Sequence, residues 1–453
     1  KNLFIRSEDI NATGLSVGSV QLATRSEGIN YYGIGTLNIN LGAGNDIFNV
    51  QGTSAVTNLN TGAGNDQVYV SSTANVNPTS GTAAFLAGNV IDFSGGNTPA
   101  MKFNLPEAAF SALITIRDAG NTIVRTMTLG SWVTGDNSVT WDGKNDGGSV
   151  LAPGAYGFSV TATRVDGTSF DGITAMKGNL DGIAGNLNID AGEGRHLLMI
   201  SDKAAVSGDA DVLITDLPVA GLPSADISIT GLAPAAITYK SDPTLGNFAD
   251  GITIWTGAGD DVITIDGTHE RTGFRTITTL NTGGGDDNVT VSLGAGTDGF
   301  FVLNTEADND VVDASASTLP LIIFGGDGLD KITGGKGNDV IFGDRGLVHY
   351  TDETGAIVTV LGNGGPGDKT DGISHTERIE VMVDPSIGGR DTIIGWDGDD
   401  LIFGQIGDDL IIGDCGEVTY DASGFVPVLV KSINPLVGGN DTIYAGEGNN
   451  TVL

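Results

Sequence analysis

Short apolar runs alternate with glycine-rich acidic turns along most of this chain. The words "LGAGNDIFNV" (41–50) and "TGAGNDQVYV" (61–70) return as "TGAGDDVITI" (256–265) and "TGGGDDNVTV" (282–291). A decayed copy, "LNIDAGEGRHLLMI", places His196 where the other copies have aspartate. Helical periodicity is nearly absent, and β-branched runs that recur about every 20 residues between glycine turns are typical of parallel β-solenoid coils. The pattern therefore predicts an all-β fold.

A shorter, nine-residue repeat dominates the C-terminal part of the chain. In "GGDGLDKIT" (325–333) and "GGKGNDVIF" (334–342), glycine, aspartate and one branched residue recur at the same positions. Two excursions interrupt this repeat, at 347–387 and 417–435, and each begins with a hairpin pattern. Because both excursions leave at the same point of the repeat, we expect the two hairpins to project from one face.

Between about residues 82 and 168 the pattern changes to longer alternating strands. Tryptophan and proline appear, the glycine-aspartate words vanish, and "ALITIRDAGNTIVRTMTL" predicts a hairpin with its turn at Asp118–Asn121. A small antiparallel sandwich explains this alternation, and coil-like sequence on both sides makes it an insertion. The segment resembles the immunoglobulin-like module of the flagellar hook-capping protein family over roughly 98–166. The residues that carry the resemblance are Trp141, Asp142, Gly143, Gly148, Gly154 and Tyr156.

The nonamer has the form G-G-x-G-x-D-x-U-x, with U apolar, and it resembles the RTX (repeats-in-toxin) calcium-binding family. The resemblance implies a parallel β-roll in which two copies form one coil, so that alternate turns stack on one edge. Ca²⁺ takes about six to eight oxygen ligands, glycine lets the backbone turn its carbonyls toward one point through unusual φ/ψ values, and aspartate supplies charge. Two carboxylates about 5 Å apart repel by about 3 kcal/mol at an effective dielectric near 20. Without bound cations we therefore expect this region to unfold, with the ions replacing an apolar core that the repeats lack.

Together these patterns predict an all-β chain, a right-handed parallel β-helix or β-roll solenoid with an inserted immunoglobulin-like β-sandwich. The expected parts are solenoid coils at 1–81, the sandwich at 82–168, further coils at 169–315, and a calcium β-roll with both excursions at 316–453. Each boundary falls where one repeat pattern gives way to another.

The resemblance assigns candidate calcium ligands position by position. In the nonamers and adjoining turns the candidates are Gly325, Asp327, Asp330, Gly334, Asp339, Gly343, Asp344, Asp391, Gly395, Asp397, Asp400, Gly404, Asp409, Gly413, Asp414 and Asp441. The longer coils add the aspartates of the same slot, which are Asp46, Asp66, Asp261 and Asp287. In those coils the alternative is a β-helix whose aspartates only cap turns. We expect Asp391 and Asp409 to share a site, and Asp400 to pair with Asp441 across the second excursion.

Several slots depart from the calcium pattern. Val348 and Val418 fill the slot where the excursions leave, and Asn450 fills it in the final copy. The turn "TEADND", which ends at Asp310, lacks the glycines, and the copy with His196 lacks the aspartate. The sequence therefore does not support metal sites at these positions.

The charge balance narrows the possible partners. The 453 residues carry 56 acidic and 21 basic side chains, a formal charge of −35. Such a field repels nucleic acid and concentrates cations, so we expect no nucleic-acid partner. The single cysteine excludes an internal disulfide framework, and no apolar run approaches the roughly 18 residues that span a membrane.

No catalytic constellation stands out, so the chain is not predicted to be an enzyme. The four histidines lack the H-E-x-x-H spacing of zinc proteases, and the G-x-S-x-G match at Ser16 lies in a predicted solenoid turn.

The predicted function is a secreted, calcium-binding structural protein at the surface of a Gram-negative bacterium, such as a surface-layer, sheath or filament subunit. Because both ends of the sequence lie at solenoid coils, we expect end-to-end self-association or continuation in a longer chain. One alternative is a calcium-dependent adhesin, whose sandwich or hairpins bind a surface glycan or another cell. The other is the accessory region of an RTX exoenzyme.

Overall fold

The structure is a computed structural model, and it contains only β-strands as regular secondary structure in the residues that it describes. These residues are 2–7, 29–31, 33–74, 89–93, 98–105, 111–118, 122–129, 135–163, 176–355, 357–362, 370, 372–382, 388–424 and 426–453. The chain divides into two compact units, one formed by Lys1–Val76 with Ala175–Leu453 and the other by Asn77–Thr174. The second unit is therefore inserted into the first, and the predicted all-β class is confirmed.

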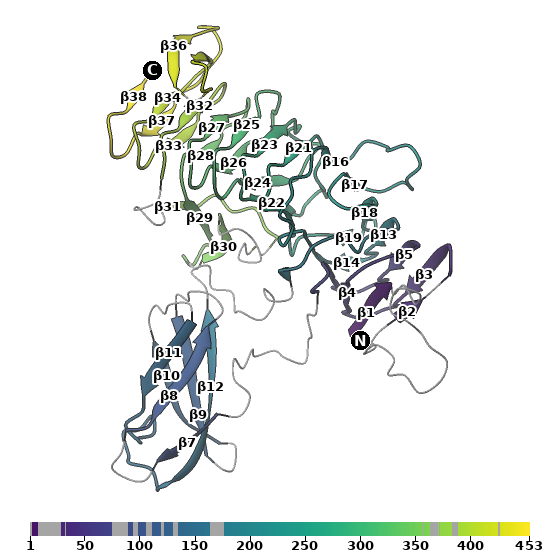
Figure 1. The fold of residues 1–453 in the computed structure, drawn as a ribbon, viewed down its shortest axis with the longest axis vertical. Helices are drawn as coiled ribbons and strands as arrows, with labels where there is room; N and C mark the ends of the chain where they lie inside the picture. Colours follow the sequence, from purple (N-terminus) through teal and green to yellow (C-terminus); the bar gives the residue numbers. More distant parts are fainter. Residues whose placement is uncertain are drawn as a thin grey trace. The chain divides into compact units, whose positions relative to one another are not determined.

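Two long sheets build the first unit, and the chain passes from one to the other coil after coil (Figure 1). In spatial order, sheet A consists of β2 (Ile29–Tyr31), β1 (Asn2–Ser7), β4 (Ile47–Val50), β6 (Gln67–Val70), β15 (Leu197–Ser201), β20 (Ile252–Gly257), β22 (Ile277–Gly283), β24 (Phe300–Asn304), β26 (Leu321–Phe324), β28 (Val340–Phe342), β33 (Leu401–Phe403) and β37 (Thr442–Tyr444). Sheet B consists of β3 (Thr36–Asn40), β5 (Val56–Asn60), β13 (Leu187–Asp190), β18 (Ile237–Lys240), β17 (Ile227–Thr230), β16 (Val212–Thr215), β21 (Val262–Ile265), β23 (Asn288–Val291), β25 (Val311–Asp313), β27 (Lys331–Thr333), β32 (Thr392–Ile394), β34 (Leu410–Ile412) and β38 (Thr451–Val452). A short parallel pair, β14 (Gly194–Arg195) and β19 (Gly246–Asn247), lies between coils.

Three-residue strands of the C-terminal coils stack in register. In sheet A, Ile341 lies beside Ile323 on one side and Ile402 on the other. In sheet B, Ile393 lies in the same way between Ile332 and Ile411. Because side chains alternate between the two faces of a strand, only the middle residue of each short strand points into the solenoid. One branched residue per nonamer is therefore enough to fill the interior.

These inward residues belong to one apolar core that runs through both kinds of coil. The core extends from Ile39 to Ile411, and most of its members are no more than 2% exposed. The expectation that bound ions replace a missing core is therefore wrong as stated, because the nonamer coils contribute Ile332, Ile341 and Ile393 to it. The nonamer coils differ in the length of their strands, since β27, β28 and β32 contain only three residues each.

One stretch of sheet B departs from the predicted parallel coils. The strands β16, β17 and β18 pair antiparallel, and the parallel order resumes where β16 meets β21. At its other side, β18 pairs parallel with β13. The loop 216–226 joins β16 to β17 and belongs to no coil. A local meander thus replaces one simple coil.

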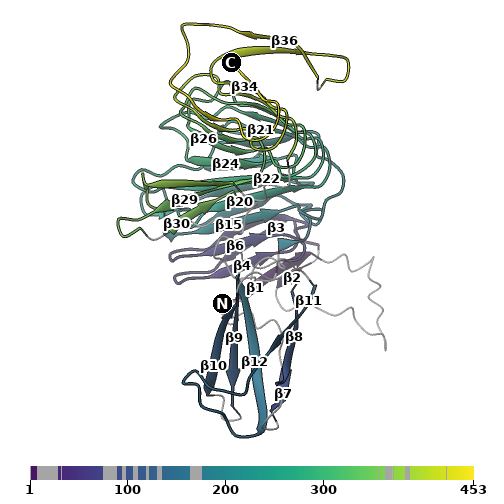
Figure 2. The same ribbon diagram turned by 90° about the vertical axis from the view of Figure 1, so that its left-hand side faces the viewer.

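Both predicted excursions contain antiparallel hairpins, but they leave from different sheets. The first follows β28 of sheet A and forms a three-stranded sheet in the order β30 (Ile357–Leu361), β29 (Gly346–Thr351), β31 (Arg378–Met382). The second follows β34 of sheet B and forms the hairpin β35 (Gly416–Tyr420) with β36 (Pro427–Ser432). Figure 2 shows the two hairpins at different levels of the solenoid. The expectation that both project from one face is wrong. Between the two exits the chain passes through β32, β33 and β34, which alternate between the sheets, so the second excursion leaves from the opposite sheet.

The first excursion covers part of the outer face of sheet A. Val348 and Leu361 pack with Phe324 and Phe342 in a second apolar cluster. Apolar contact of this kind explains why Val348 replaces the aspartate of the repeat. The excursion is thus a structural cover over the coils.

The inserted unit is a small sandwich. A four-stranded sheet contains, in order, β10 (Ile123–Leu129), β9 (Ser111–Arg117), β12 (Gly154–Thr163) and β7 (Asn89–Phe93), and a second sheet pairs β11 (Gly135–Thr140) with β8 (Ala100–Leu105). The predicted hairpin between β9 and β10 is present as an antiparallel pair. The rings of Phe93 and Tyr156 lie 5.4 Å and 5.0 Å from the Trp141 ring. Trp141 and Tyr156, two of the resemblance residues, thus lie in its core, whereas Asp142 and Gly148 are exposed.

Candidate metal centre

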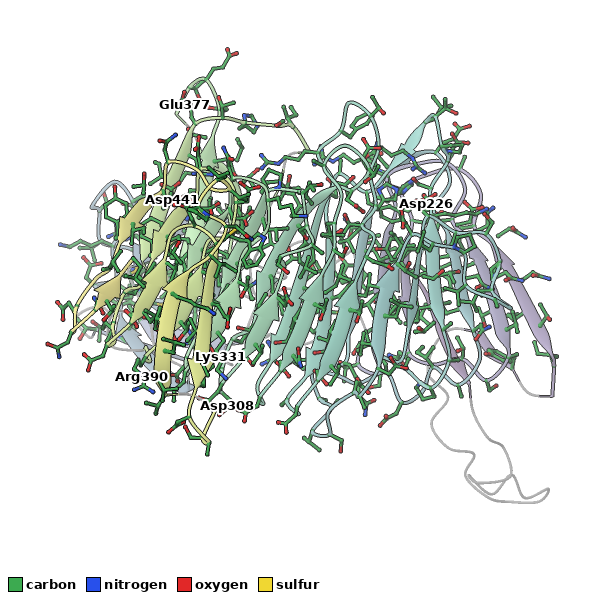
Figure 3. All side chains as sticks on the ribbon, turned by 90° about the horizontal axis from the view of Figure 1, so that it is seen from above. Asp226, Asp308, Lys331, Glu377, Arg390 and Asp441 are labelled. Atoms are coloured by element: carbon green, nitrogen blue, oxygen red, sulfur yellow. The ribbon has the colours of Figure 1, made fainter. Side chains whose placement is uncertain are left out.

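Most aspartates of the repeat stack into two columns that follow the solenoid axis. In each column, the backbone N–H of one aspartate donates to Oδ1 of the residue at the same position in a neighbouring coil. The long acidic column precedes strands of sheet B and contains Asp209, Asp261, Asp287, Asp310, Asp330, Asp391 and Asp409, with N–H to Oδ1 distances of 2.6–3.0 Å. The short acidic column precedes strands of sheet A and contains Asp339, Asp400 and Asp441, with distances of 2.8 and 3.0 Å. Figure 3 shows Asp308, from a turn of the long column, and Asp441 on opposite edges of the coils.

The two predicted pairs in the nonamers are brought together. The N–H of Asp391 donates to Asp409 at 3.0 Å, and the N–H of Asp400 donates to Asp441 at 3.0 Å. The second bond joins residues on either side of the second excursion. The stack therefore continues across the interruption.

Four column carboxylates of the nonamer coils keep one oxygen open, whereas Oδ2 of Asp339 accepts the backbone N–H of Gly335 at 2.6 Å. Oδ1 accepts the backbone N–H, whereas the other oxygen is buried without a hydrogen-bond partner in Asp330, Asp391, Asp400 and Asp409. These four side chains belong to residues that are at most 2% exposed. A buried, unpartnered carboxylate oxygen is unfavourable unless a cation or a proton satisfies it. The site therefore requires a positive charge at this oxygen.

The first glycine of each nonamer leaves room beside that open oxygen. A Cβ atom on Gly325 would lie 2.7 Å from Asp330 Oδ2 and 2.0 Å from the carbonyl oxygen of Gly343. On Gly395 it would lie 2.6 Å from Asp400 Oδ2 and 2.1 Å from the carbonyl oxygen of Gly413. Neither glycine has positive φ, so space rather than unusual backbone conformation demands glycine here. A carboxylate oxygen and a carbonyl oxygen thus face one small cradle.

Burial raises the pKa of the column carboxyls. The pKa of Asp330 is raised to about 7 and that of Asp400 to about 8, in both cases chiefly by burial. Burial and then the neighbouring Asp330 carboxylate raise the pKa of Asp391 well above its ordinary value. A nearby cation would act in the opposite direction and favour the charged carboxylates.

The donor set fits a hard divalent cation. Within the described ranges, no three His, Cys, Asp or Glu side chains converge on one point. The oxygens that converge are instead one carboxylate oxygen and backbone carbonyls from stacked turns. Ca²⁺ accepts such mixed oxygen ligands, whereas Zn²⁺ prefers nitrogen and sulfur. The cradles therefore suit calcium.

The longer coils fill the same cradle with a threonine hydroxyl. Five residues before each column aspartate they carry Thr61, Thr256, Thr282 or Thr305, where the nonamers carry the first glycine. The hydroxyl of Thr256 donates to Asp261 Oδ2 and lies 3.0 Å from the carbonyl oxygen of Thr282. It therefore connects the two kinds of oxygen that face an empty cradle in the nonamers. This arrangement favours the turn-capping alternative for Asp261, whereas Oδ2 of Asp66 and of Asp287 is buried without a hydrogen-bond partner, as in the nonamers.

Asp46 shares this environment only in part. Its N–H donates to Asp66 Oδ1 at 2.9 Å. The N–H of Asp66 in turn reaches Nδ1 of His196 at 3.3 Å, so the imidazole takes the aspartate slot. The first turns of the chain thus form a short stack of their own.

Four other predicted ligands have different surroundings. Asp344 accepts backbone N–H groups of Gly389 and Ile406, each at 3.0 Å, so both carboxylate oxygens are used. Asp414 accepts the N–H of Gly439 at 2.8 Å. These aspartates fasten the points where the two excursions rejoin the coils. Asp327 is exposed and Asp397 half-buried, and their backbone N–H groups bond the neighbouring turn.

Asp310 belongs to the long acidic column, although its sequence pattern did not support a metal site. Its turn lacks glycine, yet the residue is 0% exposed, and Glu306 and Asp308 adopt φ values of 70° and 75° in place of glycines. The 20-residue spacing to Asp330 was the signal that could have identified it. Asn450, also set aside, accepts the N–H of Asp409 at 2.8 Å and ends the long column.

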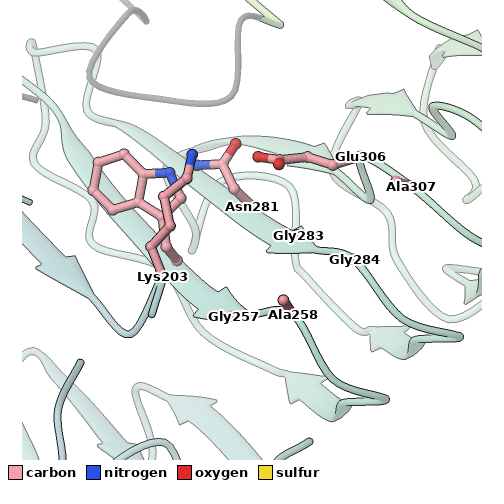
Figure 4. Close-up of a pocket in the computed structure, with 9 residues that line it drawn as sticks. Lys203, Gly257, Ala258, Asn281, Gly283, Gly284, Glu306 and Ala307 are labelled. Carbon is pink, nitrogen blue, oxygen red and sulfur yellow. The ribbon is translucent and has the colours of Figure 1, made fainter. Parts of the chain in front are cut away.

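A pocket of about 250 Å³ lies beside this glycine-free turn (Figure 4). Lys203, Asn281 and Glu306 are among its lining residues. Oε1 of Glu306 is buried without a hydrogen-bond partner, and burial raises the pKa of this carboxyl. The substitution of glutamate for a turn glycine thus places a carboxylate next to the column.

One buried cluster brings together serine, histidine and aspartate but does not form a catalytic relay. Nε2 of His269 lies 3.2 Å from Ser241 Oγ and 3.3 Å from Asp226 Oδ2. A hydrolase relay needs these partners on different ring nitrogens. Ser16, the nominal nucleophile of the G-x-S-x-G match, lies outside the described residues.

Two families match parts of the chain. The FlgD Ig-like domain matches residues 88–166, and the RTX calcium-binding nonapeptide repeat (4 copies) matches residues 322–346, 388–414 and 438–453. These are repeat and Ig-like families rather than enzyme families. No curated protein matches the chain.

Solved structures of FlgD resemble a small part of the chain. FlgD from P. aeruginosa is 26% identical, with a TM-score of 0.16, over 19% of this chain and 70% of that chain. FlgD from Xanthomonas campestris is 23% identical, with a TM-score of 0.13, over 19% of this chain and 67% of that chain. The two family matches show that the chain carries a FlgD Ig-like domain and RTX calcium-binding nonapeptide repeats, which bind Ca²⁺ at multiple sites.

Proposed function

We propose that this chain is a structural protein of a bacterial surface layer, sheath or filament, and that Ca²⁺ completes the fold of its nonamer coils. The observation that carries the proposal is the set of buried, unpartnered carboxylate oxygens of Asp330, Asp391, Asp400 and Asp409. RTX repeat proteins are typically secreted, which supports a function outside the cell. Within the described part of the chain, no helix could span a membrane.

The residues that would hold calcium are the column aspartates and the glycine carbonyls of adjacent turns. Oδ2 of Asp330 and the carbonyl of Gly343 face one cradle, and Oδ2 of Asp400 and the carbonyl of Gly413 face another. Bound Ca²⁺ supplies the positive charge that these oxygens lack. The carboxylates of one column would otherwise repel one another in a poorly solvated edge.

Calcium concentration would then control where the chain folds. Extracellular calcium modules bind with Kd values of roughly 10⁻⁴–10⁻³ M, far above the level of free calcium in the cytosol. Because the sites exist only when coils stack, binding energy is folding energy. The nonamer region would remain unfolded before export and fold outside the cell.

The repetition of similar coils supports end-to-end self-association of the chain. Each coil presents to the next the same ladder of backbone groups, inward isoleucines and column aspartates. Stacked repeats of this kind contact only their neighbours, and one coil is a template for another. End-to-end assembly of copies would extend the same contacts.

An adhesive function is the second candidate, and the second excursion favours it. Val428 and Leu429 on β36 are 63% and 53% exposed, so this hairpin presents apolar side chains to solvent. Exposed apolar residues in one place are typical of partner surfaces.

Electron microscopy and circular dichroism of the purified chain would test both functions. With millimolar CaCl₂ we expect ordered polymers, and with EGTA we expect loss of β-structure and of polymers. MgCl₂ at the same concentration is the control, because Mg²⁺ requires a smaller octahedral site. Calcium-dependent folding without polymers would favour the adhesin, and an unchanged spectrum in EGTA would contradict calcium-assisted folding.

A further inference from the structure

A polar groove of about 480 Å³ crosses the outer face of sheet B, away from the residues of both acidic columns. Its floor is formed by β3, β5, β13 and β18, and its rim by Pro223, Ser224 and Ala225 from the loop between β16 and β17. These strands are labelled in Figure 1. Its volume lies within the range of roughly 300–1,000 Å³ that is usual for ligand pockets. The groove is therefore large enough for a chain-like ligand.

Two rows of side chains line the floor in strict register. The first row is Asn38, Asn58, Asn188 and Thr238, and the second row is Asn40, Asn60, Asp190 and Lys240. Neighbouring members come from adjacent strands, which lie about 4.8 Å apart. The rows thus repeat one polar pattern over four strands.

The first row is occupied by its own hydrogen bonds. Asn58 Nδ2 donates to Asn38 Oδ1 at 2.7 Å, and Asn188 Nδ2 donates to Asn58 Oδ1 at 2.7 Å. Thr238 Oγ1 donates to Asn188 Oδ1 at 2.9 Å. The side chains of the first row thus hydrogen-bond one another across neighbouring strands, which accounts for the asparagines in this row.

The second row has no such explanation. The side-chain amides of Asn40 and Asn60 are exposed and have no hydrogen-bond partner among the described residues. The row ends in an ion pair, with Lys240 Nζ 3.2 Å from Asp190 Oδ2. It therefore offers free donors and acceptors without net charge.

Asparagine is also an unfavourable choice for these positions. It is depleted in β-strands relative to threonine and valine, and two exposed positions elsewhere in sheet B do carry Thr264 and Thr290. A departure from local preference with no compensating contact is typical of functional positions. The second row thus points to a ligand.

We propose that this groove binds a neutral oligosaccharide. Sugar hydroxyls, like side-chain amides, both donate and accept hydrogen bonds, and a pyranose unit is comparable in length to the spacing between strands. An anionic polymer is disfavoured by the charge of −35. A peptide would add to an open strand edge, whereas the floor is a sheet face whose strands are already paired. This binding is independent of the structural function proposed above.

Isothermal titration of the calcium-loaded full chain tests the proposal. The probes are three neutral hexasaccharides (cellohexaose, maltohexaose and chitohexaose) and an anionic oligogalacturonate. We expect at least one neutral probe to bind the natural chain. The double variant Asn40→Ala/Asn60→Ala should bind it roughly tenfold more weakly, as expected for two lost hydrogen bonds.

The matched control is Thr264→Ala/Thr290→Ala, which truncates a paired outward row of the same sheet outside the groove. Its affinity should equal that of the natural chain. A second variant, Ser224→Trp, fills the rim and should abolish binding while leaving the circular-dichroism spectrum unchanged. Failure of all neutral probes to bind, equal binding by the groove variant, or preferential binding of oligogalacturonate would each overturn the proposal.

Discussion

The longer coils and the nonamer coils use one architecture but stabilise it differently. In the longer coils, β20 and β22 contain six and seven residues, nearly all of them buried. In the nonamer coils, β27, β32 and β34 contain three residues each. The longer coils also bury large side chains such as Tyr239 and Phe248 in the shared core. Apolar burial per coil is larger in the longer coils, because one of them contributes Ile252, Ile254, Ile263 and Ile265 to the core, whereas a nonamer coil contributes Ile332 and Ile341.

The acidic turns differ in a complementary way. A threonine hydroxyl satisfies Asp261 in a longer coil, whereas the glycine at the same position in a nonamer leaves Asp330 or Asp400 open. Open oxygens are not confined to the nonamers, because Oδ2 of Asp287 and of Asp310 is also buried without a hydrogen-bond partner. The residue at the start of the turn therefore distinguishes Asp261, whose Oδ2 accepts a hydroxyl, from Asp330 and Asp400, whose Oδ2 is open.

Removal of calcium should separate the two regions most clearly. In EGTA we expect amides of β27, β32 and β34 to exchange with solvent roughly a hundredfold faster or more, while those of β20 and β22 remain protected. Hydrogen-deuterium exchange with mass spectrometry measures both in one sample. Equal loss of protection in the two regions would contradict the comparison.

The metal-free protein should be more stable in mild acid than at neutral pH. The pKa values of Asp330 and Asp400, about 7 and about 8, lie above the ordinary value, so the folded state holds protons that the unfolded chain releases. Their stabilising contribution is complete below about pH 4 and is lost as pH rises through the folded pKa values. Urea unfolding in EDTA at pH 5 and pH 8 measures the difference. A higher stability at pH 8 would refute this explanation.

The variant Gly395→Thr should convert a nonamer turn into a turn of the longer type. Its side chain would enter the cradle between Asp400 Oδ2 and the Gly413 carbonyl, so we expect one fewer bound Ca²⁺. Calcium-loaded stability should fall by about 1–3 kcal/mol because the cradle is overfilled. Calcium titration and urea unfolding measure the two effects. Gly35→Thr is the control, since a Cβ there meets nothing within 4 Å.

The reverse variant, Thr256→Gly, should have the smallest effect. It removes the hydroxyl that donates to Asp261 and leaves that carboxylate open. We expect a loss of about 1 kcal/mol in EGTA, the value of one hydrogen bond, with partial recovery in Ca²⁺. Equal losses with and without calcium would show that the hydroxyl and the cation are not interchangeable at this position.

Much of the acidic site could be predicted because a repeat of fixed length stacks in fixed register. The pairing of Asp391 with Asp409 needed only their spacing. Asp310 was missed because Glu306 and Asp308 adopt left-handed backbone conformations that no simple pattern announces. Asp209 was missed because it lies in an irregular loop rather than in a repeat, yet its N–H donates to Asp261 at 2.6 Å.

The sequence by itself determined the coil, its period and the presence of one acidic group per turn, because these depend on residues close together in the chain. Only the tertiary structure decided which oxygens lack partners, which sheet each excursion leaves, and which asparagines share a groove. Those features depend on contacts such as that between Asp330 and Asp391, 61 residues apart, which exist only after the coils have stacked.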